Sequence, residues 1–395
     1  MANFSDLISF TRASVGYYFN SAGNLVQAAI NEPRFDYTAV AGRAVGLLIE
    51  PAATEQNKTT NATIANTSVV GTPTRTDLTL NALGQFPGLG VASSGSLTDV
   101  VRLPNTTNAV AVTNGQPRVI EVYYQAGSSG SLRLVVANTT AGTTSIVAGA
   151  IGSAAVTATT AGSLTIVSDT VLKDTLTRRL RLKFTPNADG ALTFNLGPNS
   201  ATVGQDIVYL AAFTQLGSIF TTPILTSGST VTRAADVAKV IKVGTWFNDL
   251  YGTVYGTFRF TYEDTDLGNE VSFWRASFGG YQTNGHACVL STFSTATGRP
   301  NYHCVTDTTN NILSGSASAY SPGQDLSITV GISFDSASTK LCYNGGTVYT
   351  GVPSGNLTDV STFDMVLGGT APITVLALVC KPNLSTAAEL QTLTT

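Results

Sequence analysis

The residues of this chain that could bind a hard metal ion gather in its last third. Glu263, Asp264 and Asp266 stand within four positions of one another, just before a strand-like segment. Carboxylate oxygens spaced this way on a loop are ligands that Ca²⁺ prefers. The segment lacks the EF-hand spacing, because Leu267 and Gly268 follow in place of a ligand residue. It is a candidate calcium site, and the alternative is a solvated turn between two strands.

A second group combines histidine and cysteine, the usual zinc ligands. On a strand His286 and Cys288 share a face, whereas the neighbours His303 and Cys304 point to opposite faces. At most three of the four side chains can therefore meet without a bulge, and no Cys-x-x-Cys pair is present. The sequence predicts strand or core positions for these residues and no zinc.

Aromatic side chains supply the candidates for sugar binding, because β-sandwiches often bind sugars on exposed rings beside polar groups. Trp246, Tyr281 and Tyr302 are the candidate contacts. Tyr281 follows two glycines and Tyr302 follows Pro300, so both are expected in exposed loops. Trp274 lies within an alternating segment and is expected to be buried.

Motifs of known catalytic sites are missing from the sequence. It contains neither a Gly-x-Ser-x-Gly elbow nor a Walker-type phosphate loop. A glycosidase needs two carboxylates facing one sugar about 5 to 10 Å apart. Glu263, Asp264, Asp266 and Glu270 could supply such a pair, but so could many others, so no active site is indicated. We expect a protein that is not an enzyme.

The composition indicates which elements position these residues. The chain has 395 residues, of which 11% are charged and 43% hydrophobic, with a net charge of −3. This length suits two or three domains, and such a composition is typical of β-sandwiches with hydroxyl-rich surfaces. The charge argues against nucleic-acid binding. The longest apolar runs fall short of about 18 residues, which argues against membrane insertion.

Period-two alternation of apolar residues predicts two sandwiches. Residues 61–238 form the first, a jelly-roll-like pattern similar to carbohydrate-binding modules. Its clearest strands cover residues 119–124, 132–136, 180–184 and 192–196. Residues 239–395 form the second sandwich, with long strands at 254–262, 270–278 and 326–334, and it resembles concanavalin A-like or laminin G-like domains.

Three local signals supplement the alternation. Asn344-Gly345 is a strong hairpin turn. Thr386 and Glu389 form a capping box that begins one short C-terminal helix. The predicted fold is therefore all-β, with two sandwiches after an N-terminal arm and this single helix.

The first 60 residues carry motifs in which no residue has a catalytic pattern. They read Phe10-Thr-Arg-Ala-Ser14, Glu32-Pro-Arg-Phe-Asp-Tyr37 and Gly46-Leu-Leu-Ile-Glu-Pro-Ala-Ala-Thr54. A further motif, Leu225 to Asp236, contains Thr-Arg-Ala-Ala-Asp, and a last motif covers Leu384 to Thr394. Together these segments resemble the leader, mid-chain junction and terminal helix of surface proteins of tailed-bacteriophage virions.

The resemblance implies a fold and a location. In that group the leader precedes β-sandwich modules, often with a concanavalin- or laminin-G-like domain last. Residues 1–60 would be an arm that attaches the protein to capsid or tail proteins, and the protein would lie on the virion surface. Calcium near a sugar site is common in such domains. Ala53 and Glu55-Gln56 depart from the family, which usually has Arg and Thr-Asn there.

The arm is also rich in apolar residues, which a short arm cannot bury against itself. We therefore expect a homo-oligomer, with a trimer favoured, against the alternative that the leader folds back onto its own sandwich. The residues concerned are Phe4, Leu7, Phe10, Tyr17, Tyr18, Phe19, Leu47, Leu48 and Ile49.

The N-terminus lacks the basic and apolar stretches of a signal peptide, which predicts synthesis in the host bacterial cytoplasm. The four cysteines could form two disulfides, but cytoplasmic synthesis favours free thiols.

Three functions remain from different classes. The first is adhesion to host or environmental glycans, the second is decoration or stabilisation of the capsid without a specific ligand, and the least favoured is a polysaccharide depolymerase. No cofactor is expected apart from the candidate Ca²⁺.

Overall fold

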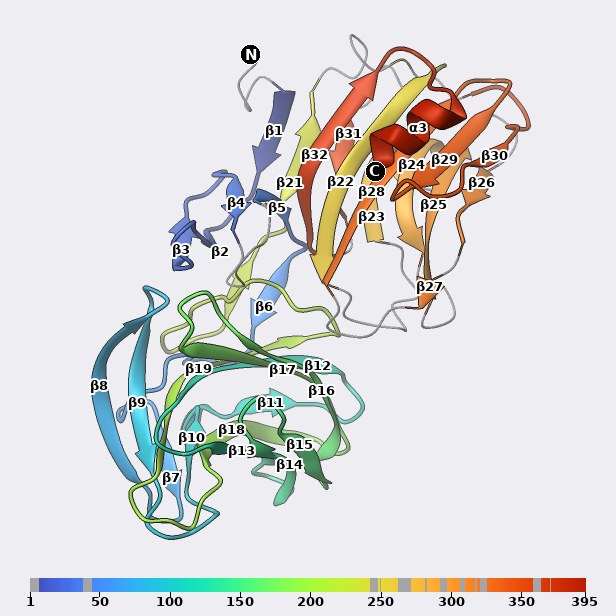
Figure 1. Ribbon diagram of the computed structural model, residues 1–395. Helices are drawn as coiled ribbons and strands as arrows, with labels where there is room; N and C mark the ends of the chain where they lie inside the picture. Colours follow the sequence, from blue (N-terminus) through green and yellow to red (C-terminus); the bar gives the residue numbers. More distant parts are fainter. Residues whose placement is uncertain are drawn as a thin grey trace.

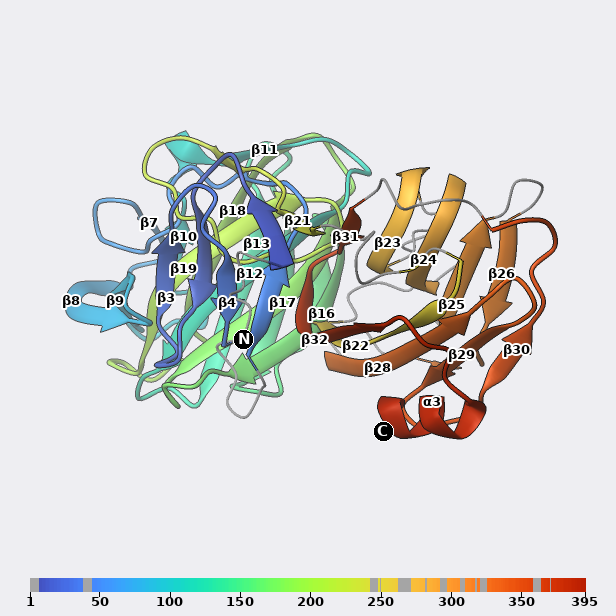
Figure 2. The same cartoon turned by 90° about the horizontal axis from the view of Figure 1, so that it is seen from above.

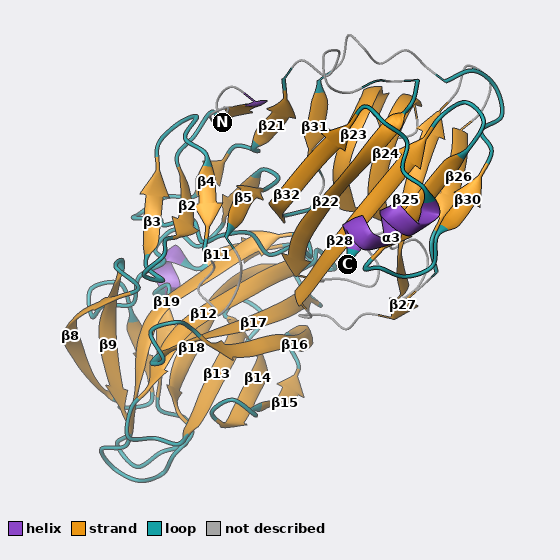
Figure 3. Cartoon of the chain, turned by 45° about the horizontal axis from the view of Figure 1, so that its top comes forward, coloured by secondary structure: helices purple, strands orange, loops and turns teal. Residues whose placement is uncertain are grey.

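The computed structural model is built almost entirely of strands, at about 58% strand and 4% helix. Figure 3 shows this dominance of strand, with the C-terminal helix as the main exception. The all-β prediction is confirmed. The structure describes residues 7–37, 45–241, 248, 250–261, 271–280, 283–291, 297–305, 310–316, 318–319, 325–357, 364–369 and 371–395.

Two β-sandwiches lie side by side, with strands of the N-terminal segment between them (Figures 1 and 2). We call the sheet of the first sandwich that faces the second sandwich the near sheet. The near sheet runs in the order β16 (Gly162–Val171), β17 (Thr177–Pro186), β12 (Arg118–Ala126), β19 (Asp206–Leu216), β6 (Ala53–Glu55), β20 (Val231–Arg233). A hairpin of β8 (Thr74–Ala82) and β9 (Phe86–Ala92) extends it, since β9 also pairs with β19.

The other sheet of the first sandwich, which we call the far sheet, lies on the side away from the second sandwich (Figure 1). Its order is β15 (Ala155–Thr159), β14 (Thr143–Ala150), β13 (Ser131–Asn138), β18 (Gly190–Pro198), β10 (Val100–Leu103), β7 (Ser68–Val70), and β11 (Val110–Val112) also pairs with β18. The short 3₁₀ turn η1 (Thr106–Asn108) connects β10 to β11.

Alternation along these strands gives the first sandwich its core. Leu180, Leu182 and Phe184 point inward from the near sheet and are buried, as their spacing predicts. They meet residues of the far sheet such as Phe194 and Leu196 in one apolar cluster. Burial of each such side chain contributes about 1.5 to 3 kcal/mol.

The second sandwich uses strands from both ends of the chain. One sheet runs β30 (Tyr349–Gly351), β29 (Thr339–Tyr343), β28 (Asp325–Phe334), β22 (Gly252–Thr261), β32 (Ile373–Lys381), β5 (Gly46–Ile49), β4 (Arg34–Asp36). The other runs β1 (Ile8–Thr11), β21 (Val237–Val240), β31 (Met365–Leu367), β23 (Val271–Gly280), β24 (Thr283–Ser291), β25 (Thr297–Val305), β26 (Asn310–Ser314), with β27 (Ser318–Ala319) on β25.

The N-terminal segment is thus built into the fold. The sequence predicts a separate arm over residues 1–60, but β1 pairs with β21, and β5 pairs with β32 in the second sandwich. Phe10, Leu47 and Ile49 belong to the core of that sandwich. The strand β6 of the same segment pairs within the first sandwich. The alternative in which the leader folds back is the one that the structure shows for these strands.

A hairpin in the leader covers the near sheet. The strands β2 (Gly16–Phe19) and β3 (Leu25–Ala28) are joined by the turn at Asn20 to Gly23, where Gly23 has a φ of +83°. Phe19 and Leu25 are buried against Phe86 and Phe213. The apolar side chains of the β2–β3 hairpin are therefore buried inside the chain, because the hairpin covers a face of the near sheet that would otherwise be exposed.

The other local signals also hold. Asn344 and Gly345 both have positive φ values, +47° and +64°, in the turn between β29 and β30. The helix α3 (Ala387–Thr394) begins with the predicted capping box, in which Thr386 and Glu389 bond to each other's backbone amides. Of its apolar residues Leu390 is fully buried, whereas Leu384, before the helix, is 44% exposed.

Candidate functional site

The motifs of the leader and the mid-chain junction meet in one buried charge cluster. Arg12, Arg34 and Glu50 come from the three leader motifs, and Arg233 and Asp236 come from the junction motif. All five side chains are almost completely buried. Because charges this deep are costly unless paired, their pairing decides what the cluster can do.

Each carboxylate joins two arginines. Asp236 accepts from Arg12 at 3.2 Å and also bonds Arg34, while Glu50 accepts from Arg34 at 2.6 Å and also bonds Arg233. Thr222 donates its backbone N–H and its hydroxyl to Glu50 at 2.6 and 2.7 Å. Burial raises the pKa of Glu50, but Arg233 and Arg34 outweigh it and bring the pKa to about 2.

Arg12 shows why this cluster is structural. Beyond Asp236, its guanidinium donates to the backbone carbonyls of Ser14, Glu32 and Ala29 at 2.8, 3.2 and 2.6 Å. It therefore fixes the β2–β3 region onto the junction between the sandwiches. The cluster couples the leader to both sandwiches, and it offers no exposed group to a solute.

The candidate contact Tyr302 lies elsewhere than expected. It belongs to β25 and is fully buried, with its hydroxyl 2.6 Å from Nδ1 of His286. The prediction of an exposed loop position is wrong, because the residue continues an alternating strand past Pro300. A buried ring offers no platform to a sugar. Trp274 is buried in the same core, as predicted.

The other candidates lie outside the described residues. They are the ligand candidates Trp246 and Tyr281 and the calcium candidates Glu263, Asp264 and Asp266.

The histidine and cysteine group divides between two faces of its sheet. His286 and Cys288 face the core, and Cys304, opposite His286 in the register, does the same. His303 lies on the other face, opposite Ala287. Among the residues that the structure describes, no three metal-ligating side chains are placed to hold an ion. All four cysteines are free thiols.

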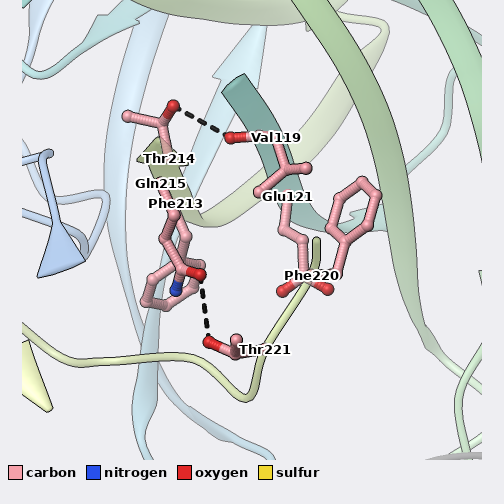
Figure 4. Close-up of a pocket in the computed structure, with 7 residues that line it drawn as sticks. All are labelled: Val119, Glu121, Phe213, Thr214, Gln215, Phe220 and Thr221. Atoms are coloured by element: carbon pink, nitrogen blue, oxygen red, sulfur yellow. Dashed lines mark hydrogen bonds between the residues drawn. The ribbon is translucent and has the colours of Figure 1, made fainter. Parts of the chain in front are cut away.

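A small cavity lies on the outer side of the near sheet (Figure 4). Its volume is about 10 Å³, which is room for about one water molecule. Thr221 donates to Gln215 at 3.0 Å across it, and Glu121 in its wall pairs with Arg181 at 2.6 Å. This cavity is too small for a ligand.

A larger groove of about 440 Å³ runs beside α3, between Lys381 and Leu393. Its carboxylate, Glu389, is engaged in the capping box of the helix. The remaining lining is mostly exposed side chains, and its buried polar residue, Ser385, already accepts a hydrogen bond from the Thr253 hydroxyl at 3.1 Å.

The far sheet carries a different arrangement on its outer face. Leu192, Phe194 and Leu196 of β18 point into the core, so Thr193 and Asn195 point outward. Even so, Thr193 is 0% and Asn195 3% exposed. The side-chain oxygens Oγ1 of Thr193 and Oδ1 of Asn195 are buried without a hydrogen-bond partner.

Two arginines flank these residues on the neighbouring strands. Arg102 of β10 lies directly opposite Asn195, and Arg133 of β13 lies opposite Gly197, the next outward position of β18. The Nε atoms of both arginines are buried and unpartnered, as is Oγ of Ser68 beside Arg102. Within the described part of the chain, neither guanidinium makes a hydrogen bond or an ion pair.

We call these five residues the far-face polar strip: Ser68, Arg102, Arg133, Thr193 and Asn195. Native proteins partner more than about 90% of their buried polar groups, and each unpartnered one costs about 1 to 3 kcal/mol. Several such groups therefore gather on one outward face of the sheet, where they are shielded from solvent and have no hydrogen-bond partner among the described residues.

Sequence reasoning did not find this strip, although part of the signal is present. The alternation in residues 132–136 and 192–196 already places Arg133, Thr193 and Asn195 on the outer face. The neighbourhood of β10, β18 and β13 is set by long-range pairing, which alternation does not reveal.

The comparisons with known proteins give no family. No protein-family model and no curated protein matches the chain. Among solved structures it is similar to a carbohydrate-binding module, CBM40, of the Ruminococcus gnavus IT-sialidase bound to α2,6-sialyllactose. The two share 16% identity at a TM-score of 0.29, over 37% of this chain and 84% of that one.

Two further structures have comparable scores. The tandem CBM22 domains of Paenibacillus barcinonensis Xyn10C share 9% identity over 87% of this chain and 100% of theirs, with a TM-score of 0.27. Domains LG4-5 of mouse laminin α1 share 10% over 65% and 76%, with a TM-score of 0.23. These scores are too low to assign an activity or a ligand.

Proposed function

We propose that this chain is a non-catalytic surface protein of a bacteriophage particle that adheres to glycans through the far-face polar strip. The observation that carries the binding role is the group of buried, unpartnered polar atoms on an outward face of the first sandwich. Saccharides present many hydroxyl groups that donate and accept hydrogen bonds, so they fit a surface rich in unused capacity of both kinds.

The location on a virion rests on the resemblance of the sequence motifs. The residues that carry it, among them Arg12, Arg34 and Asp236, are the same residues that build the buried charge cluster. The resemblance thus involves a physically coupled unit. The far sheet lies on the side of the first sandwich away from the second sandwich, so its outer face is turned toward the outside of the molecule (Figure 1).

The test is binding of the fluorescently labelled full chain to bacterial cells and to an immobilised panel of their surface polysaccharides. We expect binding that weakens by about tenfold when Asn195→Ala and Thr193→Val are combined, because a hydrogen bond to a ligand is worth about 1 kcal/mol or more. Thr157→Val, on the exposed strand β15, is the matched control and should change nothing.

The capsid-decorating alternative predicts a different outcome. A chain without a specific ligand would bind neither cells nor polysaccharides, while the purified protein would still bind particles that lack it. Release of reducing ends from a polysaccharide would favour the depolymerase, and it would overturn the non-catalytic assignment.

A further inference from the structure

The positive charge of the far-face polar strip indicates which class of glycan it binds. Arg102 and Arg133 are the ionised members of the strip, and Ser68, Thr193 and Asn195 are neutral. Arginine stays charged at any physiological pH and carries five donors and no acceptor. The strip therefore offers two positive charges with unused donors.

Arg102 and Arg133 are only partly buried, whereas most of the more deeply buried arginines of this chain have an acidic partner. Arg34, Arg233 and Arg181 each bond a carboxylate. Arg102 and Arg133 have none among the described residues. The contrast matters because an unpaired, partly desolvated arginine gains most from an incoming carboxylate, which it can bind with two parallel hydrogen bonds.

The acidic residue at the end of the strip is already engaged. The backbone oxygen of Asp99 lies 2.1 Å from where a Cβ on Gly197 would sit, so Asp99 borders the face. Its carboxylate accepts from the amide of Thr72 at 3.0 Å and from the amide and hydroxyl of Ser94 at 2.7 and 2.8 Å. It is therefore held within its own loop.

The spacing of the strip suits a sugar unit. Adjacent strands lie about 4.8 Å apart, so Arg102 and Arg133, on either side of β18, have backbones separated by roughly 10 Å across the sheet. Asn195 and Thr193 lie on the strand between them. One guanidinium can take an acid group while the amide and the hydroxyl take neighbouring hydroxyl groups.

We propose that the far-face polar strip binds a carboxylate-bearing saccharide, in which Arg102 or Arg133 pairs with the sugar acid and Asn195 and Thr193 bond its hydroxyl groups. This inference rests on the proposed adhesive function and specifies its ligand class. Binding draws the arginine side chains toward the ligand and gives the buried oxygens the partners that the chain does not supply.

The experiment compares oligosaccharides of uronic acids with the same oligosaccharides after chemical reduction of their carboxyl groups to alcohols. Titration calorimetry of the full chain measures both. We expect the acidic form to bind at least about tenfold more tightly, since hydrogen bonds to charged groups contribute about 1.5 to 3 kcal/mol. The advantage should shrink as salt rises from 0.05 to about 0.5 M.

Variants assign the effect to the strip. The double variant Arg102→Gln, Arg133→Gln should weaken binding of the acidic form and leave binding of the reduced form within about twofold. The two single variants show which arginine pairs with the acid, and thermal unfolding reports whether the variants fold. Arg102→Lys keeps the charge but loses the forked geometry, so it should restore only part of the affinity. Arg299→Gln, exposed on the second sandwich, is the matched control.

The outcomes separate the two proposals. Equal binding of acidic and reduced forms, lost in the Asn195→Ala and Thr193→Val double variant, would overturn the acidic ligand and keep the adhesive function. Binding of neither form, together with no binding to cells or polysaccharides, would overturn both. A preference for the acidic form that survives the double arginine variant would place the charge recognition elsewhere and overturn this inference.

Discussion

Two buried glutamates show how the surroundings of a single residue decide its charge. Glu50 bonds Arg34 and Arg233, which bring its pKa to about 2. Glu55 is equally buried, but it accepts only backbone amides of Thr214 and Asn57 on one oxygen, at 2.7 and 2.9 Å. Burial raises the pKa of Glu55 well above its usual value. The contributions of the two carboxylates to folding stability therefore change with pH in opposite directions.

The first prediction concerns acid stability and Glu50. In the folded state the pKa of Glu50 is about 2, which is lower than its ordinary value of 4.5. The ionised carboxylate therefore stabilises the fold above pH 4.5, and this contribution is lost as the pH falls from 4.5 toward 2. Glu50→Gln should remove it and leave two buried arginines underpaired, at a cost of about 3 to 5 kcal/mol at pH 7. Denaturant unfolding from pH 7 to 2.5 measures it, and an unchanged unfolding free energy at pH 7 would contradict the role of the cluster.

The second prediction concerns alkaline stability and Glu55. A raised folded-state pKa means that the carboxyl stabilises the fold while protonated, fully below pH 4.5, and that the contribution is lost as pH rises through the folded-state pKa. Glu55→Gln is neutral and nearly isosteric, so we expect equal or higher stability at pH 9 with a flatter pH profile. Unfolding midpoints of the variant and the parent chain at pH 5, 7 and 9 test this expectation. A variant less stable than the parent at pH 9 would show that Glu55 is needed in its ionised form.

At the scale of elements, the cap of α3 offers a local test. Thr386 accepts from the amide of Glu389 at 3.2 Å, and Glu389 bonds back. Thr386→Ala should cost about 1 kcal/mol of folding stability. The helix packs Leu390 and Thr394 over Gly331 of β28, so the loss should appear in the second sandwich. Thr392→Ala, exposed on the same helix, serves as the control, and equal effects of both changes would contradict a specific cap.

The fourth prediction concerns the leader strands. A chain that begins at Thr60 loses β1, β4 and β5, and with them Phe10, Leu47 and Ile49 from the second core. We expect this shortened chain to be insoluble or to bind dyes that report exposed apolar surface. Circular dichroism and sedimentation compare it with the full chain. A soluble, equally stable shortened chain would mean that these strands do not complete the second sandwich.

The elements divide sharply into those that the sequence predicts and those that it does not. Alternation placed Leu180, Leu182 and Phe184 inward because strand periodicity is a local property. Turn and cap residues such as Asn344 and Thr386 also act within a few positions. The pairing of β1 with β21 joins residues more than 220 positions apart. No local sequence pattern specifies this pairing, so the sequence of the leader predicts a free arm.

The same limit applies to the sites. The motifs around Arg12, Arg34 and Asp236 were visible as separate segments, but only the fold brings their charges together. The far-face polar strip depends on three strands that meet through long-range pairing. Conversely, the nearby Pro300 predicts a loop at Tyr302, whereas the strand β25 continues through that position.

At the scale of the whole molecule, the structure buries several of the apolar side chains on which the prediction of a trimer rests. Phe10, Phe19, Leu47, Leu48 and Ile49 are buried within the chain, so they are not available to a partner. Leu7, by contrast, is 47% exposed. The trimer stays a prediction, and sedimentation of the full chain at several concentrations tests it.

The last prediction is that the two sandwiches unfold together. The leader has strands in both of them, and Asp236 ties Arg12 and Arg34 to the junction through side chains that are fully buried. Loss of order in either sandwich would expose this charge cluster and the apolar contacts of the β2–β3 hairpin. The intact chain should therefore show one calorimetric transition, with agreement between calorimetric and van't Hoff enthalpies. Asp236→Ala leaves two arginines without that carboxylate and should separate the transition into two, whereas Asp364→Ala, which removes an exposed pair with Lys239 at 3.5 Å, should not. Two transitions in the unaltered chain would mean that the sandwiches fold independently and that the buried cluster does not couple them.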